Sequence, residues 1–261
     1  MTTGQSLSPA EFTLPDGRVI FCTNERNAEL IWHEMSTSVY LREQEKLPDD
    51  ATIIDVGAHF GLFSLHTASG LANARVLACE PASATFDCLS RNFAAHLPGG
   101  TALRTAVADR SGTVELTYYP ANETIATIEV DEEDDQRNIS AVFENVGADP
   151  AQSEAYCSEL RRAAERYPVP VTTIAQLFAD HDLDTVDLLK IDVERAELAV
   201  LRGIGEANWP RIRTVSVEVH DLDGRLNEVV SLLSAKGYRT EQLQQDLYKG
   251  SSVHIVRAHR P

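Results

Sequence analysis

The sequence is poor in basic residues and has no long apolar run. Lysine and arginine number 23 against 40 aspartates and glutamates, which gives a formal charge of −17 at pH 7. Nucleic acids and anionic membranes are bound by basic surfaces, so this excess of acid disfavours both as partners. No apolar stretch reaches the roughly 18 residues that cross a bilayer. The first residues also lack the basic and apolar regions of a secretory signal, so we expect a cytoplasmic protein.

Cysteines are few and widely spaced. The four lie at positions 22, 79, 88 and 157, and no two of them form a CxxC pair. This spacing disfavours a structural zinc site or a redox-active pair, so we expect four reduced thiols. Of the 261 residues, 43% are apolar and 24% are charged, which is ordinary for a folded protein with a sizeable core.

From residue 51 onward, apolar runs alternate with helical patterns. Strands are predicted at 51–56, 75–79, 102–107, 186–191 and 212–219, and helices at 60–69, 82–95, 173–181, 195–203 and 225–236. When a helix follows each strand, neighbouring strands form parallel pairs, and the connections between them are right-handed crossovers. Two late strands, at 238–243 and 252–257, are predicted to form an antiparallel hairpin at the sheet edge. The pattern therefore predicts an α/β fold.

The chain has an N-terminal extension before this α/β region. Residues 1–50 are predicted to contain a polar tail, a short strand at 18–22 and a helix at about 27–42. No low-complexity linker separates this extension from residues 51–261. We therefore expect both parts to belong to one domain.

One long stretch breaks the strand–helix alternation. A β element is predicted at 111–120, and residues 121–168 then look irregular apart from a helix at 153–166. This stretch contains the acidic run DEEDD at 131–135, which favours a solvated face or a mobile loop. A segment of this length inside a compact domain is often a lid or a binding segment. We expect it to help cover a ligand and to be mobile without one.

A glycine loop, DVGAHFG at 55–61, directly follows the first of these strands. Gly57 and Gly61 allow a tight turn and a close approach to a ligand. Asp55, at the strand end, can accept hydrogen bonds, and ligands of such folds bind beyond the carboxyl ends of the strands. The GxxxG spacing differs from the GxGxxG dinucleotide fingerprint, which disfavours a nicotinamide cofactor.

Acidic residues end the neighbouring strands. Glu80 closes the second strand, where an acid can bind both hydroxyls of a ribose. Asp192 closes the fourth strand, and Glu194 and Glu197 follow it. The positions of Glu194 and Glu197 are also typical of carboxylates that interact with the N-terminus of a helix. Acids beside a cleft can hold a cation, a metal or a proton in transit.

The fifth strand ends in Glu218-Val219-His220. Alternation along a strand places Glu218 and His220 on one face. A histidine with an ordinary pKa near 6.5 can act as a general base at neutral pH. Two alternatives stay open: His220 packs or orients an acceptor, or Asp192, Glu218 and His220 bind a divalent metal. No spacing is diagnostic of a metal site, so we expect none.

Three ordered segments carry a family resemblance. TIIDVGAHFGLFSLHTA, VLACEPASATFDCLSRNF and VDLLKIDVERAELAVLRGI resemble the FkbM family of S-adenosylmethionine-dependent methyltransferases, and so do TAVADRSGTVELTYYP and the helix with Glu34 and Tyr40. The resemblance covers roughly residues 29–221. It implies the class I methyltransferase (Rossmann-like) fold, in which seven strands are ordered 3-2-1-4-5-7-6 and strand seven is antiparallel.

The resemblance also implies a cofactor site, with S-adenosylhomocysteine as the product. Asp55, Gly57 and Gly61 would line the methionine part, and further cofactor-binding residues would be Ala58, His59, Asp192 and Tyr40. Glu80 would bind the ribose, and Ala106 and Val107 would border the adenine. The sequence departs from the family at two positions: His59 stands where the family commonly has Asn, and Arg195 stands where it commonly has Gly. Arg195 would add positive charge near the methyl acceptor.

The function implied is methylation of a hydroxyl oxygen on a natural product or glycan, with a polyketide, peptide or sugar as the small-molecule acceptor. His220 and Asp192 are the candidate catalytic bases. Two other functions stay open. One is a nicotinamide-dependent reductase, and the other is a module that binds S-adenosylmethionine without chemistry.

Overall fold

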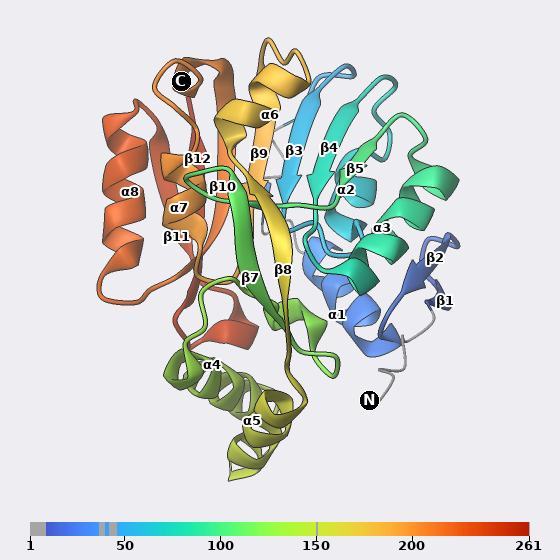
Figure 1. The fold of residues 1–261 in the computed structure, drawn as a ribbon, viewed down its shortest axis with the longest axis vertical. Coiled ribbons are helices and arrows are strands. Elements are labelled where there is room, and N and C mark those ends of the chain that lie inside the picture. Colours follow the sequence, from blue (N-terminus) through green and yellow to red (C-terminus); the bar gives the residue numbers. More distant parts are fainter. Residues whose placement is uncertain (1–8, 37–39, 42–45, 150, 261) are drawn as a thin grey trace.

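A seven-stranded mixed sheet forms the centre of the computed structural model, which describes residues 9–36, 40–41, 46–149 and 151–260 (Figure 1). Its strands are β3 (Thr52–Val56), β4 (Arg75–Cys79), β5 (Thr101–Leu103), β9 (Val186–Ile191), β10 (Ile212–His220), β11 (Arg239–Leu243) and β12 (Val253–His259). Their spatial order is β11-β12-β10-β9-β3-β4-β5, and β12 is antiparallel to both of its neighbours. Counted along the chain within this sheet, the order is 3-2-1-4-5-7-6.

Alternating residues of the strands send apolar side chains to both faces of the sheet. On one face, Ile53, Val76 and Leu188 pack against α1 (Glu25–Ser36), α2 (Leu62–Thr67) and α3 (Ser83–His96). On the other face, Ile54, Leu77 and Leu189 pack against α6 (Ile174–Asp180), α7 (Glu197–Arg202) and α8 (Arg225–Ala235). Because both faces are covered, the inner strands read as continuous apolar runs in the sequence. The predicted α/β fold with a mixed sheet is confirmed.

The N-terminal extension shares the first of these cores. Its strands β1 (Ala10–Thr13) and β2 (Val19–Cys22) form an antiparallel hairpin, and Leu14, Ile20 and Met35 are buried against the sheet-covering helices. The strand β1 was not expected from the polar tail. The predicted helix at 27–42 begins earlier, at Glu25, and α1 ends at Ser36; part of the predicted range lies outside the described residues.

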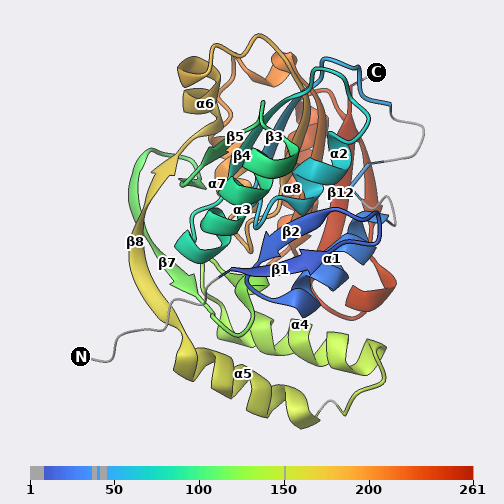
Figure 2. The same ribbon diagram turned by 90° about the vertical axis from the view of Figure 1, so that its right-hand side faces the viewer.

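A second, smaller sheet carries the long stretch at 121–168, which we call the insertion. It contains β6 (Ala106–Val107), β7 (Gly112–Tyr118) and β8 (Glu165–Thr172), in the order β6-β8-β7. The predicted strand at 102–107 is therefore two strands, because the chain leaves the main sheet after Leu103 and pairs with β8. From this sheet extend α4 (Glu132–Asn145) and α5 (Ala151–Ala163), which lie beyond the central sheet in both views (Figure 2).

The expectation of an irregular stretch at 121–168 is wrong. Asp131 caps α4 by accepting hydrogen bonds from the backbone N–H groups of Glu133 and Asp134 at 3.1 and 2.9 Å. The acids of the first turn also suit the positive end of the helix dipole. Ile139 of α4 and Cys157 and Leu160 of α5 then form a small core of their own. The expected helix at 153–166 is present as α5, which begins and ends two or three residues earlier.

The remaining helical elements are three 3₁₀ turns. They are η1 (Glu123–Ile125), η2 (Trp209–Arg211) and η3 (Asp246–Tyr248). None of the helices in the described part of the chain combines the length and the hydrophobicity that a membrane span requires.

Candidate functional site

A cavity of about 1060 Å³ lies where the parallel strands of the main sheet end. This volume is at the upper end of the roughly 300–1,000 Å³ typical of small-molecule sites. The site residues predicted from the sequence that line it are Tyr40, Gly57, Ala58, His59, Glu80, Ala106, Val107, Asp192 and His220. Parts of α4 and η3 line the far side. The insertion thus lies over the carboxyl edge of the sheet, whereas its expected mobility stays a prediction.

Asp55 is not among the residues that line this cavity, so its contact with a cofactor stays a prediction. Its side chain is fully buried between the sheet and α2, where Oδ2 accepts a hydrogen bond from Ser64 Oγ at 2.7 Å. Its other oxygen lies 3.3 Å from Lys190 Nζ. Lys190 also donates to the carbonyl of Gly57 at 2.8 Å. Asp55 therefore positions the glycine loop through Lys190.

The two glycines of the loop have different roles. Gly57 has φ +75°, and a Cβ there would lie 1.7 Å from the carbonyl oxygen of Asp192, so no side chain fits between the ends of β3 and β9. Gly61 also has a positive φ, and a Cβ there would lie 2.6 Å from Leu89 Cδ1 of α3. Gly61 therefore allows α2 to pack against α3; it is not among the residues that line the cavity, and its contact with a cofactor stays a prediction.

Glu80 is held rigidly at the end of β4. Oε1 accepts hydrogen bonds from Ala82 N at 2.9 Å and Thr85 Oγ1 at 2.8 Å, and Oε2 accepts one from His59 N at 2.9 Å. Burial raises the pKa of Glu80 to about 7, because these hydrogen bonds only partly offset the loss of water. A buried carboxylate with a remaining acceptor position is suited to binding a ligand hydroxyl.

His59 occupies a left-handed backbone position, with φ +53°. This conformation favours Asn among residues with a side chain, which accounts for the Asn that the family commonly has there. Burial lowers the pKa of His59 to about 3, so the ring is neutral. Neither ring nitrogen makes a hydrogen bond with the described residues, and Nε2 lies 3.8 Å from Glu123 Oε1. The ring thus offers a donor and an acceptor to a ligand.

Asp192 lies at the centre of the cavity wall. Its Oδ2 is 3.2 Å from Lys190 Nζ and accepts a hydrogen bond from the Tyr40 hydroxyl at 3.3 Å. The same hydroxyl is 3.0 Å from Glu218 Oε2. Asp192 is one quarter exposed, unlike the fully buried Asp55, so it is accessible from the cavity.

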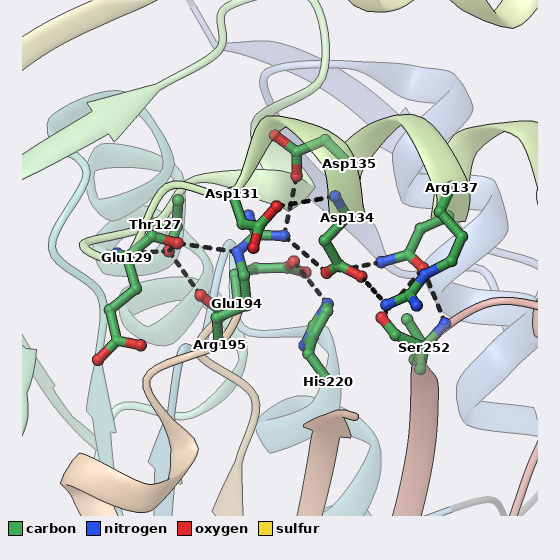
Figure 3. Close-up of polar contacts among 12 residues, drawn as sticks. Thr127, Glu129, Asp131, Asp134, Asp135, Arg137, Glu194, Arg195, His220 and Ser252 are labelled. Carbon is green, nitrogen blue, oxygen red and sulfur yellow. Dashed lines mark hydrogen bonds and ion pairs between the residues drawn. The ribbon is translucent and has the colours of Figure 1, made fainter. Parts of the chain in front are cut away.

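His220 is bound on both ring nitrogens by carboxylates. Nδ1 lies 3.0 Å from Glu197 Oε1. Nε2 lies 3.1 Å from Glu194 Oε2, and Figure 3 shows this contact. Burial lowers the pKa of His220, but the charge of Glu194 and hydrogen bonds to Glu194 and Glu197 outweigh it and raise the pKa well above 6.5. The expectation that His220 titrates near neutrality is therefore wrong. A protonated imidazole has no lone pair with which to accept a proton.

Arg195 holds α4 through ion pairs with its first turn (Figure 3). Its Nη1 lies 3.2 Å from Asp134 Oδ2 and 2.9 Å from Asp135 Oδ1, and its Nε donates to the carbonyl of Glu129 at 2.8 Å. The Arg195 side chain is 1% exposed. The acidic run is thus not a solvated face at Asp134 and Asp135. These two aspartates compensate the charge of Arg195, which also lines the cavity, so its position near an acceptor stays a prediction.

The backbone that carries Arg195 is strained. Glu194 and Arg195 have φ values of +51° and +81°, which residues with a side chain seldom adopt. Hydrogen bonds hold the turn: Thr127 Oγ1 donates to the Glu194 carbonyl at 2.5 Å, Arg195 N donates to Glu197 at 2.7 Å, and Arg225 donates to the Arg195 carbonyl. This turn directs Glu194 toward His220.

Among the polar residues that line the cavity are some to which the sequence assigned no role in the site. They include Glu34, Glu123, Gln245 and Tyr248. Burial raises the pKa of Glu34 to about 7, although Gln245 Nε2 donates to Glu34 Oε1 at 2.6 Å. Glu34 does belong to the family-like helix, which is a usable signal. Gln245 and Tyr248 lie in and beside a 3₁₀ turn with no distinctive pattern.

Residues 55–240 match the family described as the methyltransferase FkbM domain. A 31-O-demethyl-FK506 methyltransferase FkbM from Streptomyces tacrolimicus is 32% identical over 248 residues, or 95% of either chain. The methyltransferase sdnD of Sordaria araneosa is 34% identical over 228 residues, which is 84% of this chain and 85% of that one. The crystal structure of methyltransferase FkbM from Methylobacillus flagellatus KT is 13% identical, with a TM-score of 0.49, over 90% of this chain and 52% of that one.

Proposed function

Since the chain belongs to the FkbM methyltransferase family, we propose that it transfers the methyl group of S-adenosylmethionine to a hydroxyl oxygen of a small molecule, such as a polyketide, peptide or sugar. The observation that carries this proposal is the placement of Glu80, the Gly57 loop and Asp192 around one cavity. The relatives named for natural-product methylation support the class of acceptor, as the name of the Streptomyces protein indicates.

The residues present fit the proposed cofactor. Glu80 offers a buried carboxylate for ribose hydroxyls, and the buried Ala106 and Val107 offer an apolar wall for an adenine ring. His59 adds a neutral ring with two unpartnered nitrogens. Gly57 lets the chain after β3 approach the backbone of Asp192 closely, which places both at the same cavity wall. These features favour an uncharged, hydroxyl-bearing nucleoside at this side of the cavity.

For catalysis, Asp192 replaces His220 as the candidate base. When bound, S-adenosylmethionine supplies a methyl group on a positively charged sulfur, which keeps the electron pair of the broken bond. Asp192 accepts the proton of the acceptor hydroxyl, whose oxygen forms the new bond to carbon. Lys190 and Tyr40 hold the Asp192 carboxylate in place through its Oδ2. Positioning within the cavity supplies much of the remaining rate.

Binding of the cofactor product tests the proposal. We expect S-adenosylhomocysteine to bind with low-micromolar affinity, near about −8 kcal/mol, and to raise the melting temperature, whereas NADPH does neither. Changing Glu80→Ala removes one charged hydrogen-bond pair and should weaken binding by about 1.5–3 kcal/mol in calorimetry. The control is Glu115→Ala, which removes an exposed glutamate of β7. Unchanged affinity in Glu80→Ala would contradict the ribose assignment.

A panel of hydroxylated acceptors with a labelled methyl donor then tests the transfer itself. Labelled ether product supports the proposal. Stabilisation by NADPH in place of S-adenosylhomocysteine would support a reductase. Binding of S-adenosylhomocysteine with no transfer to any acceptor would support a binding module.

The pH dependence of S-adenosylhomocysteine binding follows from the pKa of Glu80, which burial raises to about 7. The ionised carboxylate accepts the stronger hydrogen bonds from ribose hydroxyls. Affinity should therefore rise about tenfold from pH 6 to pH 8, as the carboxyl of the ligand-free protein loses its proton. The Glu80→Gln variant should lose most of this dependence. An equally steep rise in Glu80→Gln would assign it to another group.

A further inference from the structure

Three side chains that commonly bind metals converge at one point of the cavity wall. Glu194 follows β9, and Glu218 and His220 lie two positions apart on β10. One carboxylate oxygen from each glutamate and one ring nitrogen of His220 lie within 4.8 Å of one another. Ligand atoms about 2.2 Å from one ion are at most about 4.4 Å apart, so a small side-chain rotation brings all three to a common ion. We propose that Glu194, Glu218 and His220 bind a divalent transition-metal ion.

His220 is oriented as metal-binding histidines usually are. Such a histidine donates one ring N–H to a carboxylate and presents its other nitrogen to the ion. Here Glu197 lies 3.0 Å from Nδ1, and Nε2 lies 3.1 Å from Glu194 and becomes a ligand once the ion displaces its proton. Glu197 is fully buried at the start of α7 and is held by the backbone N–H of Arg195 at 2.7 Å. Glu197 is therefore a positioning residue for His220.

Glu218 provides an independent indication that a cation binds here. Its side chain is buried, with 7% exposure, and Oε2 accepts a hydrogen bond from Tyr40. Its other oxygen, Oε1, receives no hydrogen bond or ion pair from the residues that the structure describes. A buried carboxylate is costly unless a positive charge compensates it. The nearby ammonium group of Lys190 is shared between Asp55 and Asp192.

The charges around the cluster agree with this interpretation. Asp192, Glu34 and Glu194 place negative charge around Glu218, which a divalent cation would compensate. Two carboxylates and one imidazole form a ligand set suited to ions such as Mn²⁺, Fe²⁺ or Zn²⁺. Three protein ligands leave coordination positions open toward the cavity.

The metal site has a use that rests on the proposed function. An acceptor hydroxyl that occupies an open position would be oriented beside Asp192, which lines the same cavity wall. Coordination also lowers the pKa of a bound hydroxyl, so that Asp192 removes its proton more readily. The ion itself binds without cofactor or acceptor, because all three protein ligands belong to this chain.

Titration of the chelator-treated protein with Mn²⁺ tests the site. Electron paramagnetic resonance should detect one bound ion per chain, and pulsed measurements should show coupling to an imidazole nitrogen. Glu218→Gln should weaken Mn²⁺ binding at least about tenfold, and Glu197→Gln roughly 10–100-fold through His220. The matched control is Glu123→Gln, a buried cavity glutamate beside His59, whose Mn²⁺ affinity should not change.

Each outcome decides the proposal. No stoichiometric Mn²⁺ binding, binding without nitrogen coupling, or unchanged affinity in a folded Glu218→Gln variant overturns it. If that variant does not fold, the nitrogen coupling of the unmodified protein decides alone. Failure of the proposed function is separate, since S-adenosylhomocysteine binding and methyl transfer are measured independently. Full methyl transfer by protein freed of metal by a chelator would overturn the role of the ion while leaving the methyltransferase intact.

Discussion

Replacing Arg195 with alanine is expected to lower the free energy of unfolding by about 3–5 kcal/mol. Arg195 is 1% exposed and contacts Asp134, which is fully buried, and Asp135, which is nearly so. Its removal leaves Asp135 in the interior without this positive partner and Asp134 with only the half-exposed Arg137. Alanine keeps the left-handed backbone, so the strain at φ +81° is unchanged and the loss reports the ion pairs. Denaturant titration followed by circular dichroism measures the change.

The control for this prediction is Arg137→Ala. Arg137 also pairs with Asp134, at 2.5 Å, but its side chain is 47% exposed. An exposed partner contributes little, so the expected loss is below about 1 kcal/mol. A second variant, Arg195→Ala with Asp134→Asn and Asp135→Asn, should recover part of the stability, because it removes the uncompensated charges. Equal losses in Arg195→Ala and Arg137→Ala would show that the buried ion pairs do not hold α4.

Replacing Lys190 with methionine is expected to lower the free energy of unfolding by about 3–5 kcal/mol. Methionine keeps much of the volume of the side chain but removes the charge that is shared by Asp55 and Asp192. Asp55 is fully buried and would keep only its hydrogen bond from Ser64. The carbonyl of Gly57 would also lose its donor. Chemical denaturation of the variant measures the loss.

Lys236→Met is the matched control for Lys190. Lys236 pairs with Glu206, whose side chain is 86% exposed, so its loss should change stability by less than about 1 kcal/mol. If Lys190→Met were as mild as Lys236→Met, the charge of Lys190 would not be what joins β3 to β9.

Local sequence patterns predicted the strands that are covered by helices on both faces of the sheet. The ranges predicted for β4 and β9 coincide with the observed Arg75–Cys79 and Val186–Ile191, because a doubly covered parallel strand is a continuous apolar run bounded by polar residues. The sequence also placed Glu80 and Asp192 at the strand ends, where the cavity lies.

Features that depend on distant partners were not predictable in this way. The acids at the start of α4 look like a solvated charge run, because their partner Arg195 is about sixty residues further along the chain. The raised pKa of His220 depends on Glu194, which the left-handed turn after β9 directs toward it. Neither periodicity nor spacing contains this information.

The link between Arg195 and the two aspartates constrains the order in which substitutions can accumulate. A glycine at position 195 would adopt φ +81° without strain, but it would remove the buried cation that pairs with both Asp134 and Asp135. Conversely, neutral side chains on α4 would leave a buried guanidinium without a counter-charge. The three positions therefore form an epistatic unit, in which each residue is tolerated only in the background of the others. These three residues can therefore change in evolution only when they are replaced together. Single-site mutational scans will report that none of the three positions tolerates substitution.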